Sequence, residues 1–123
     1  MIREFNSTLK SFVTFLNVNS NDEDIQYYYN MLDSILKLDA TKAIEQYVLH
    51  ILPYNKEIQN KNTDFFVNLN LDNQLNNDKK HILKALKLKN MFKILDKEKQ
   101  DIIFDYLILL SEYSSLYFTS RYN

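Results

Sequence analysis

A lysine-rich stretch over residues 79–99 is the segment whose residue types and spacing best suit a chemical role. Eight lysines fall within these 21 residues, opposed by two acidic side chains. On a helix, Lys80, Lys84 and Lys87 would share one face, and such a stripe can follow nucleic-acid phosphates with salt-sensitive affinity. The alternative is a solvated helix face, which the lack of accompanying arginines and of interleaved exposed aromatic residues favours. The candidate nucleic-acid contacts are Lys80, Lys84, Lys87 and Lys93.

Three carboxylates, Asp101, Asp105 and Glu112, would lie on the outer face of a helix expected over residues 97–119. Grouped carboxylates can transfer protons or bind a hard cation such as Ca²⁺. No histidine or second acidic helix can be placed opposite them from the sequence. We therefore expect a solvated face, partly neutralised by Lys97 one helical turn away.

Residue types that usually carry enzyme chemistry are scarce in this chain. It contains no glycine and no cysteine, and its only histidines are His50 and His81. The P-loop, the dinucleotide fingerprint and the G-x-S-x-G elbow all require glycine at fixed positions, so all three are excluded. Disulfides, thiolate nucleophiles and cysteine zinc sites are excluded as well. The two histidines form no metal-binding pair, and we expect no catalytic residue, metal or cofactor.

Aromatic residues are numerous, with 17 tyrosines and phenylalanines in 123 residues. Three consecutive tyrosines at 27–29 cannot all face one core, because neighbouring helical residues point about 100° apart. More aromatic residues crowd the C-terminus. Tyrosine is favoured at protein interfaces, although a core of large residues would explain the same composition. The candidate interface residues are Tyr27, Tyr113, Tyr117 and Phe118.

Helical periodicity predicts the elements that would position these residues. Apolar residues spaced three and four apart predict a helix over about 2–17, and a second helix begins near Asp22. A third helix follows Asp39, a suitable N-cap, and ends before Pro53.

The second half of the chain is less regular before its final helix. Phe65 and Phe66 are too apolar for a free loop and should insert into the core. A basic helix is expected from about residue 78, with a break near 88–90 because Leu88 would otherwise fall on the lysine face. A short turn follows, and Asp96 should cap the final helix over about 97–119. Because that helix is apolar on most sides, we expect it to be central in its bundle.

These elements predict one all-α domain over residues 1–123, a compact bundle of about five helices. The net charge of −1 gives no global attraction for nucleic acid or lipid, and no apolar run is long enough to cross a membrane. We therefore expect an intracellular protein with no membrane contact. Asn, Lys, Ile, Tyr and Phe make up 56 of the 123 residues, which indicates an AT-rich genome.

The region from residue 47 to 118 contains Asp64-Phe65-Phe66, Phe92, Lys99, Phe104 and Tyr106-Leu107. With the hydrophobic positions around them, these residues resemble a family of short, uncharacterised helical proteins of large nucleocytoplasmic DNA viruses. The family pattern is an acidic residue followed by two phenylalanines, and later a helix with an aromatic residue, a lysine and a Tyr-Leu pair. The family usually carries Trp at two positions that are Phe here. The resemblance implies a viral origin, in the host cytoplasm, viral factory or virion, and no known activity.

The favoured function is non-enzymatic: a viral helical protein acting through contacts with a protein partner or with copies of itself. It would be a virion component, an assembly factor or a self-associating scaffold. One alternative is a nucleic-acid-associated protein that uses Lys79–Lys99. Another is a host-modulating bundle like the poxviral apoptosis regulators, which would need a groove for an amphipathic host helix.

Overall fold

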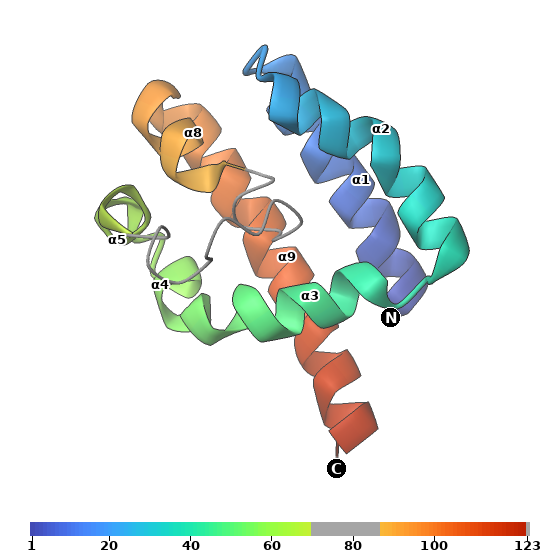
Figure 1. The fold of residues 1–123 in the computed structure, drawn as a ribbon. Coiled ribbons are helices and arrows are strands. Elements are labelled where there is room, and N and C mark those ends of the chain that lie inside the picture. The colour runs from blue at the N-terminus through green and yellow to red at the C-terminus, as the bar shows by residue number, and fades with distance from the viewer. Residues whose placement is uncertain (70–86, 123) are drawn as a thin grey trace.

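The computed structural model describes residues 1–69 and 87–122. These residues fold as an all-α bundle, as the sequence predicts (Figure 1). They form more helices than the five expected, because α4, α5 and α8 are short additional segments of five to seven residues. The elements are α1 (Ile2–Val18), α2 (Glu23–Leu38), α3 (Lys42–His50), the 3₁₀-helix η1 (Leu52–Tyr54), α4 (Asn55–Gln59), α5 (Thr63–Asn68), α8 (Leu88–Ile94) and α9 (Lys97–Tyr122).

Helices α1 and α2 form an antiparallel hairpin, and α2 begins at Glu23, next to the start predicted near Asp22. Asn21 takes the left-handed conformation, with φ at 58°, that glycine would otherwise supply. Asp22 then caps α2, because its carboxylate accepts hydrogen bonds from the backbone N–H groups of Asp24 and Ile25. The apolar stripe of α1 is fully buried and includes Phe5, Leu9, Phe12, Val13 and Leu16.

The start of α3 differs from the prediction. Thr41, and not Asp39, occupies the N-cap position. The Asp39 carboxylate instead accepts hydrogen bonds from the backbone N–H and the hydroxyl of Thr41, at 2.9 and 2.7 Å. A short polar side chain that bonds two residues ahead makes a turn before the helix, which delays the helix start. The helix ends before Pro53 as expected, and the proline lies in η1.

The phenylalanine pair of α5 inserts into the core as predicted. Phe66 is buried, and Phe65 packs against the core beside it. The Phe66 ring lies 5.4 Å from that of Phe92 in α8 and 5.9 Å from that of Phe104 in α9. Phe92 and Phe104 stack on one another at 4.8 Å. This aromatic cluster ties the short helices α5 and α8 to α9.

The break before α8 is confirmed one residue earlier than expected. Lys87 is left-handed, with φ at 50°, and a helix rather than a turn begins at Leu88. Leu88 is 2% exposed and lies in the core, and the basic helix expected before it falls outside the described residues. At the other end of α8, the side-chain amide of Gln100 donates to the carbonyl oxygens of Phe92 and Leu95.

Helix α9 is central, as predicted, and packs against α1, α3 and α4. Asp96 caps it by accepting a hydrogen bond from the backbone N–H of Lys99 at 2.9 Å. Its 26 residues span about 39 Å, and its C-terminal turns project beyond α3 (Figure 1). Two contacts show that α1 runs antiparallel to it: Phe12 stacks on Tyr106, and the Met1 sulfur lies 4.0 Å from the Ser120 hydroxyl.

Candidate functional site

The lysine-rich stretch falls partly outside the described residues, which include neither Lys80, His81 nor Lys84. Lys93 is exposed on α8, where it is accessible to a ligand. Lys87 is not on an exposed helix face, which corrects the prediction for this residue. Its side chain is 29% exposed, and its ammonium group pairs with Asp24 at 2.8 Å and Asp22 at 3.3 Å. The ion pairs of Lys87 therefore connect the start of α8 to the start of α2.

The ion pairs of Lys87 shift the pKa values of Lys87 and of Asp22. The hydrogen bond to Asp24 raises the pKa of the Lys87 ammonium above its usual value, against the opposing effect of partial burial. Partial burial works to raise the pKa of Asp22. The backbone N–H of Asp24 and the Lys87 ammonium outweigh that effect and lower the Asp22 pKa. The acidic first turn of α2 is thus occupied by capping and ion pairing rather than presented as a cation site.

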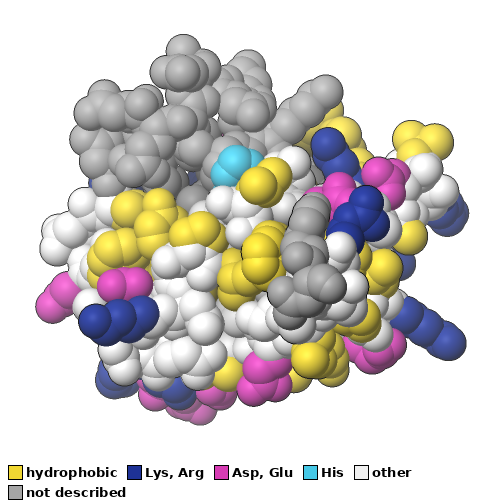
Figure 2. Space-filling view, turned by 90° about the horizontal axis from the view of Figure 1, so that it is seen from below, with side chains coloured by type: hydrophobic (Ala, Val, Ile, Leu, Met, Phe, Trp, Pro, Cys, Tyr) yellow, Lys and Arg dark blue, Asp and Glu magenta, His cyan; other side chains and the backbone are white. Residues whose placement is uncertain are grey.

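The four candidate interface residues lie in three different environments. Tyr27 is exposed on α2 and Phe118 is exposed near the end of α9. Tyr113 is half-buried against the core. Tyr117 is buried, and its hydroxyl donates to the Glu45 carboxylate at 2.9 Å, so it offers little surface to a partner. Figure 2 views the molecule from the end at which α9 projects, and hydrophobic side chains lie there among charged ones.

A second apolar stripe runs along the outer face of α9. Its members are spaced alternately four and three residues apart, which is the spacing of a helix–helix seam. Leu109 is 37% exposed and Leu116 is 61% exposed, while the other members are half-buried. Helix α1 covers one part of the stripe, where Phe12 and Phe15 contact the ring of Tyr106. We call this set the outer stripe: Ile102, Tyr106, Leu109, Tyr113 and Leu116.

The three carboxylates on the outer face of α9 are not equivalent. Asp101 pairs with Lys97 at 3.6 Å, as the sequence predicts, although both side chains are well exposed. Asp105 pairs with Lys61 at 3.1 Å. Lys61 follows α4 and is itself left-handed, with φ at 50°. Glu112 is exposed, and no ion pair to it occurs within the described part of the chain.

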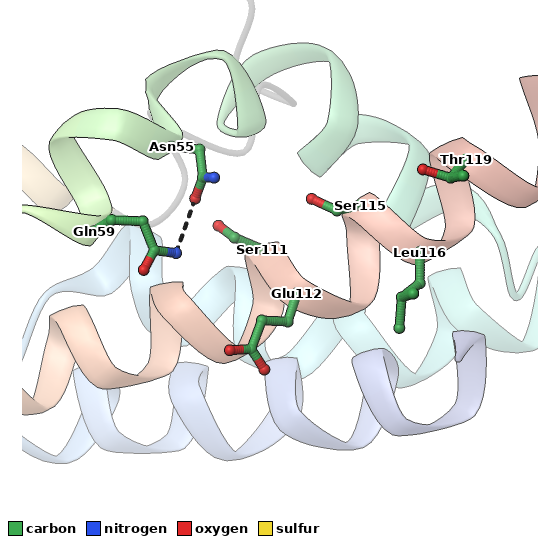
Figure 3. Close-up of a pocket in the computed structure, with 7 residues that line it drawn as sticks. All are labelled: Asn55, Gln59, Ser111, Glu112, Ser115, Leu116 and Thr119. Carbon is green, nitrogen blue, oxygen red and sulfur yellow. Dashed lines mark hydrogen bonds between the residues drawn. The ribbon is translucent and has the colours of Figure 1, made fainter.

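Glu112 borders a surface pocket of about 470 Å³ between α4 and the C-terminal half of α9 (Figure 3). Asn55 and Gln59 form one wall, where the Gln59 amide donates to the Asn55 side-chain oxygen at 3.2 Å. Opposite them, the hydroxyl groups of Ser111 and Ser115 point toward α4. Glu112, Leu116 and Thr119 complete the lining from α9.

A buried hydrogen-bond chain lies beneath this pocket. The Tyr47 hydroxyl is 2.9 Å from the Leu107 carbonyl oxygen and 2.7 Å from the Ser111 hydroxyl. A phenol has one hydrogen to donate, and a carbonyl can only accept. Tyr47 therefore donates to Leu107 and accepts from Ser111, and burial raises its pKa so that it stays protonated. The Ser114 hydroxyl donates to the Ser111 carbonyl oxygen nearby.

Sequence reasoning missed the role of these serines. Ser111 and Ser114 are buried, yet they appeared in the sequence only as hydroxyl groups without a base. Their spacing of four and seven residues from Leu107 puts them on the same buried face, and that periodicity is the signal that could have identified them. Their partner, Tyr47, lies 64 residues before Ser111 in the chain.

Residues 1–69 and 87–122 contain neither a metal-binding cluster nor a membrane-spanning helix. No group of three or more His, Cys, Asp or Glu side chains in these ranges could hold a metal ion. None of the helices described there is long and apolar enough to cross a membrane.

Comparison with known proteins gives one distant relative, which supports the viral resemblance. An uncharacterised protein of Acanthamoeba polyphaga mimivirus is 24% identical over 126 residues, covering 95% of this chain and 69% of the relative. The chain has a giant-virus homologue. The resemblance to proteins of large nucleocytoplasmic DNA viruses is therefore confirmed, and it extends over nearly the whole sequence. No family model and no solved structure matches the chain.

Proposed function

We propose that the protein is non-enzymatic and acts through protein–protein contacts in a large DNA virus, as a virion component, an assembly factor or a self-associating scaffold. The observation that carries the proposal is the outer stripe of α9. Its alternating spacing of four and three residues suits a second helix that inserts side chains between them. Burial of its exposed members, Leu109 and Leu116, in such a contact would stabilise the complex.

The two faces of α9 support the proposal together. One face of α9 lies in the core of the bundle, where Ile103, Leu107 and Leu110 are all completely buried. The outer stripe adds apolar residues on an adjoining side, about 100° round the helix, so that two sides of α9 are apolar. A helix of this kind is usually covered on both sides, and α1 covers only part of the second side here.

Recovery of partners from the native cells tests the proposal. The tagged full chain is captured with and without nuclease, in low and high salt, and bound proteins are quantified by mass spectrometry. We expect a defined viral partner, or further copies of the chain, to survive both treatments. Leu116→Asp should abolish that recovery, because it puts a carboxylate into the seam.

Ile94→Asp is the matched control, since Ile94 is similarly exposed but lies on α8, outside the outer stripe. It should leave the recovery unchanged. Equal recovery with both variants would contradict the role of the outer stripe. Loss of all partners after nuclease and high salt would instead favour a nucleic-acid function for the lysine-rich stretch.

A further inference from the structure

We propose that α9 binds a basic amphipathic helix of another protein along one exposed line of side chains. From residue 102 to residue 117, the only exposed residues of α9 are Asp105, Leu109, Glu112 and Leu116, which we call the ridge. They are spaced four, three and four residues apart, so they follow one another along the same side of the helix. This inference rests on the proposed function, because both leucines belong to the outer stripe, and it identifies the chemistry of the partner.

The ridge alternates between carboxylates and leucines. Asp105 and Glu112 are seven residues apart, and so are Leu109 and Leu116, so each kind of side chain recurs after two turns, about 10.5 Å along the axis. Figure 3 shows that Glu112 and Leu116 point away from α4 on the same side of α9. A helix that lies along the ridge would therefore meet negative and apolar side chains in turn.

The negative charge of the ridge is not balanced by its own helix. Residues 100–120 contain three acidic side chains and no lysine or arginine. Lys61 binds the Oδ1 atom of Asp105 at 3.1 Å, but the Asp105 side chain is still 67% exposed. Glu112 forms no ion pair within residues 1–69 and 87–122. A partner can therefore place cations beside both carboxylates while its apolar residues cover the leucines.

A second copy of the ridge cannot supply those cations. If two ridges pack face to face, each carboxylate meets either a leucine or a carboxylate of the other copy. Like charges repel, and a carboxylate covered by leucine loses water without gaining a partner. The ridge therefore favours a different protein, whose helix carries lysine or arginine next to its apolar residues, as in other helix-binding surfaces.

Two synthetic helical peptides of about three heptads test the proposal on the full chain. Both carry leucines seven residues apart, and the positions that flank the leucines are lysine in one peptide and glutamate in the other. Fluorescence anisotropy measures the two dissociation constants. We expect saturable binding of the lysine peptide and at least about tenfold weaker binding of the glutamate peptide. No binding of the lysine peptide, or equal binding of both, would overturn the proposal.

Charge reversal on the ridge tests where the lysine peptide binds. Glu112→Lys should weaken its binding about tenfold, because an attraction becomes a repulsion. Glu23→Lys is the matched control, since it makes the same charge change at an exposed position on α2, and it should leave the affinity unchanged. The circular dichroism spectra of both variants check that they are folded. An equal loss of affinity in both would show only general electrostatic attraction and would overturn the proposal.

Two further measurements distinguish a failure of this inference from a failure of the proposed function. Analytical ultracentrifugation of the full chain should show no dimer that depends on the ridge. A dimer disrupted by Leu116→Asp would assign the ridge to a second copy, which overturns the inference and leaves the proposed function standing. In the capture from native cells, loss of the partner with Leu116→Asp but not with Glu112→Lys would have the same meaning. Recovery unchanged by Leu116→Asp would contradict the proposed function itself.

Discussion

The phenol of Tyr47 in α3 donates its hydrogen to the backbone carbonyl oxygen of Leu107 in α9, at 2.9 Å, in the centre of the bundle. The Leu107 carbonyl oxygen also accepts a backbone hydrogen bond within α9. The phenol therefore donates to the second lone pair of that oxygen. Tyr47 is completely buried, and its ring also packs edge-on against Phe5 of α1. One side chain therefore joins three helices through one ring and one hydroxyl group.

Tyr47→Phe tests the contribution of that hydroxyl. The ring contacts remain, but Ser111 loses its acceptor and Leu107 loses a donor. We expect the free energy of unfolding to fall by about 1–2 kcal/mol. Tyr28→Phe is the control, since the Tyr28 hydroxyl forms no hydrogen bond within the described residues; it should change stability by less than about 0.5 kcal/mol. Urea denaturation of both variants gives the comparison, and equal effects would contradict the role assigned to Tyr47.

Two substitutions at Lys87 distinguish the contribution of its ion pairs to stability from the cost of its left-handed backbone conformation. Lys87→Ala keeps the left-handed strain and removes the contacts with Asp22 and Asp24, so it should lower stability by about 0.5–1 kcal/mol, a range that allows for solvent screening. Lys87→Gly also removes the ion pairs but relieves the strain, and it should be about 1 kcal/mol more stable than Lys87→Ala. Thermal or urea unfolding measures both, and a glycine variant no more stable than the alanine variant would contradict a left-handed Lys87.

Because the pKa of Asp22 is lowered in the folded protein, we expect the stability contributed by the Lys87–Asp22 ion pair to depend on pH. The Asp22 pKa in the folded protein lies below the usual value of 3.8, so the contribution of Asp22 to stability is complete above that pH and is lost as the pH falls through the folded-state pKa. The stability difference between the wild-type protein and Lys87→Ala should therefore shrink as the pH falls below 3.8. Urea unfolding at several pH values tests this, and a difference that stays constant or grows in acid would argue against the pair.

Leu110 and Leu116 provide a matched pair on the two sides of α9. Leu110 is completely buried, and Leu116 is 61% exposed. Leu110→Asp should abolish folding, because it buries a carboxylate without a partner, whereas Leu116→Asp should keep the helical circular dichroism signal and a cooperative transition. A well-folded Leu110→Asp protein would remove this face of α9 from the core.

Local sequence signals were sufficient where neighbouring residues decide the structure. The stripe of α1, the caps at Asp22 and Asp96 and the buried Phe66 were all predictable, because each depends on periodicity or on a side chain bonding its own helix. The start of α3 was not, since Asp39 and Thr41 are both good caps and the hydrogen bond between them decides the outcome. Two suitable capping residues only two positions apart leave a helix boundary undetermined at the sequence level.

The candidate site depends more on contacts between distant segments, and less of it was predictable. Periodicity placed Glu112 on the outer face of α9, but only the fold shows that Asp105 pairs with Lys61, whereas Glu112 has no ion pair within residues 1–69 and 87–122. The burial of the C-terminal aromatic residues also depends on the fold. Tyr117 is buried against α3, whereas Phe118 is exposed on the end of α9, although they are neighbours in sequence.

The two left-handed lysines have a consequence for how this sequence can diverge. Lys61 and Lys87 each hold a backbone conformation that suits glycine, and each is paired with a carboxylate on another element. The chain uses lysine rather than glycine at both turns and contains no glycine at all. Each turn is then linked by selection to a remote acid: Lys61 to Asp105, and Lys87 to Asp24. Homologues that carry glycine at a turn would lack the ion pair, so turn and acid should vary together across the lineage.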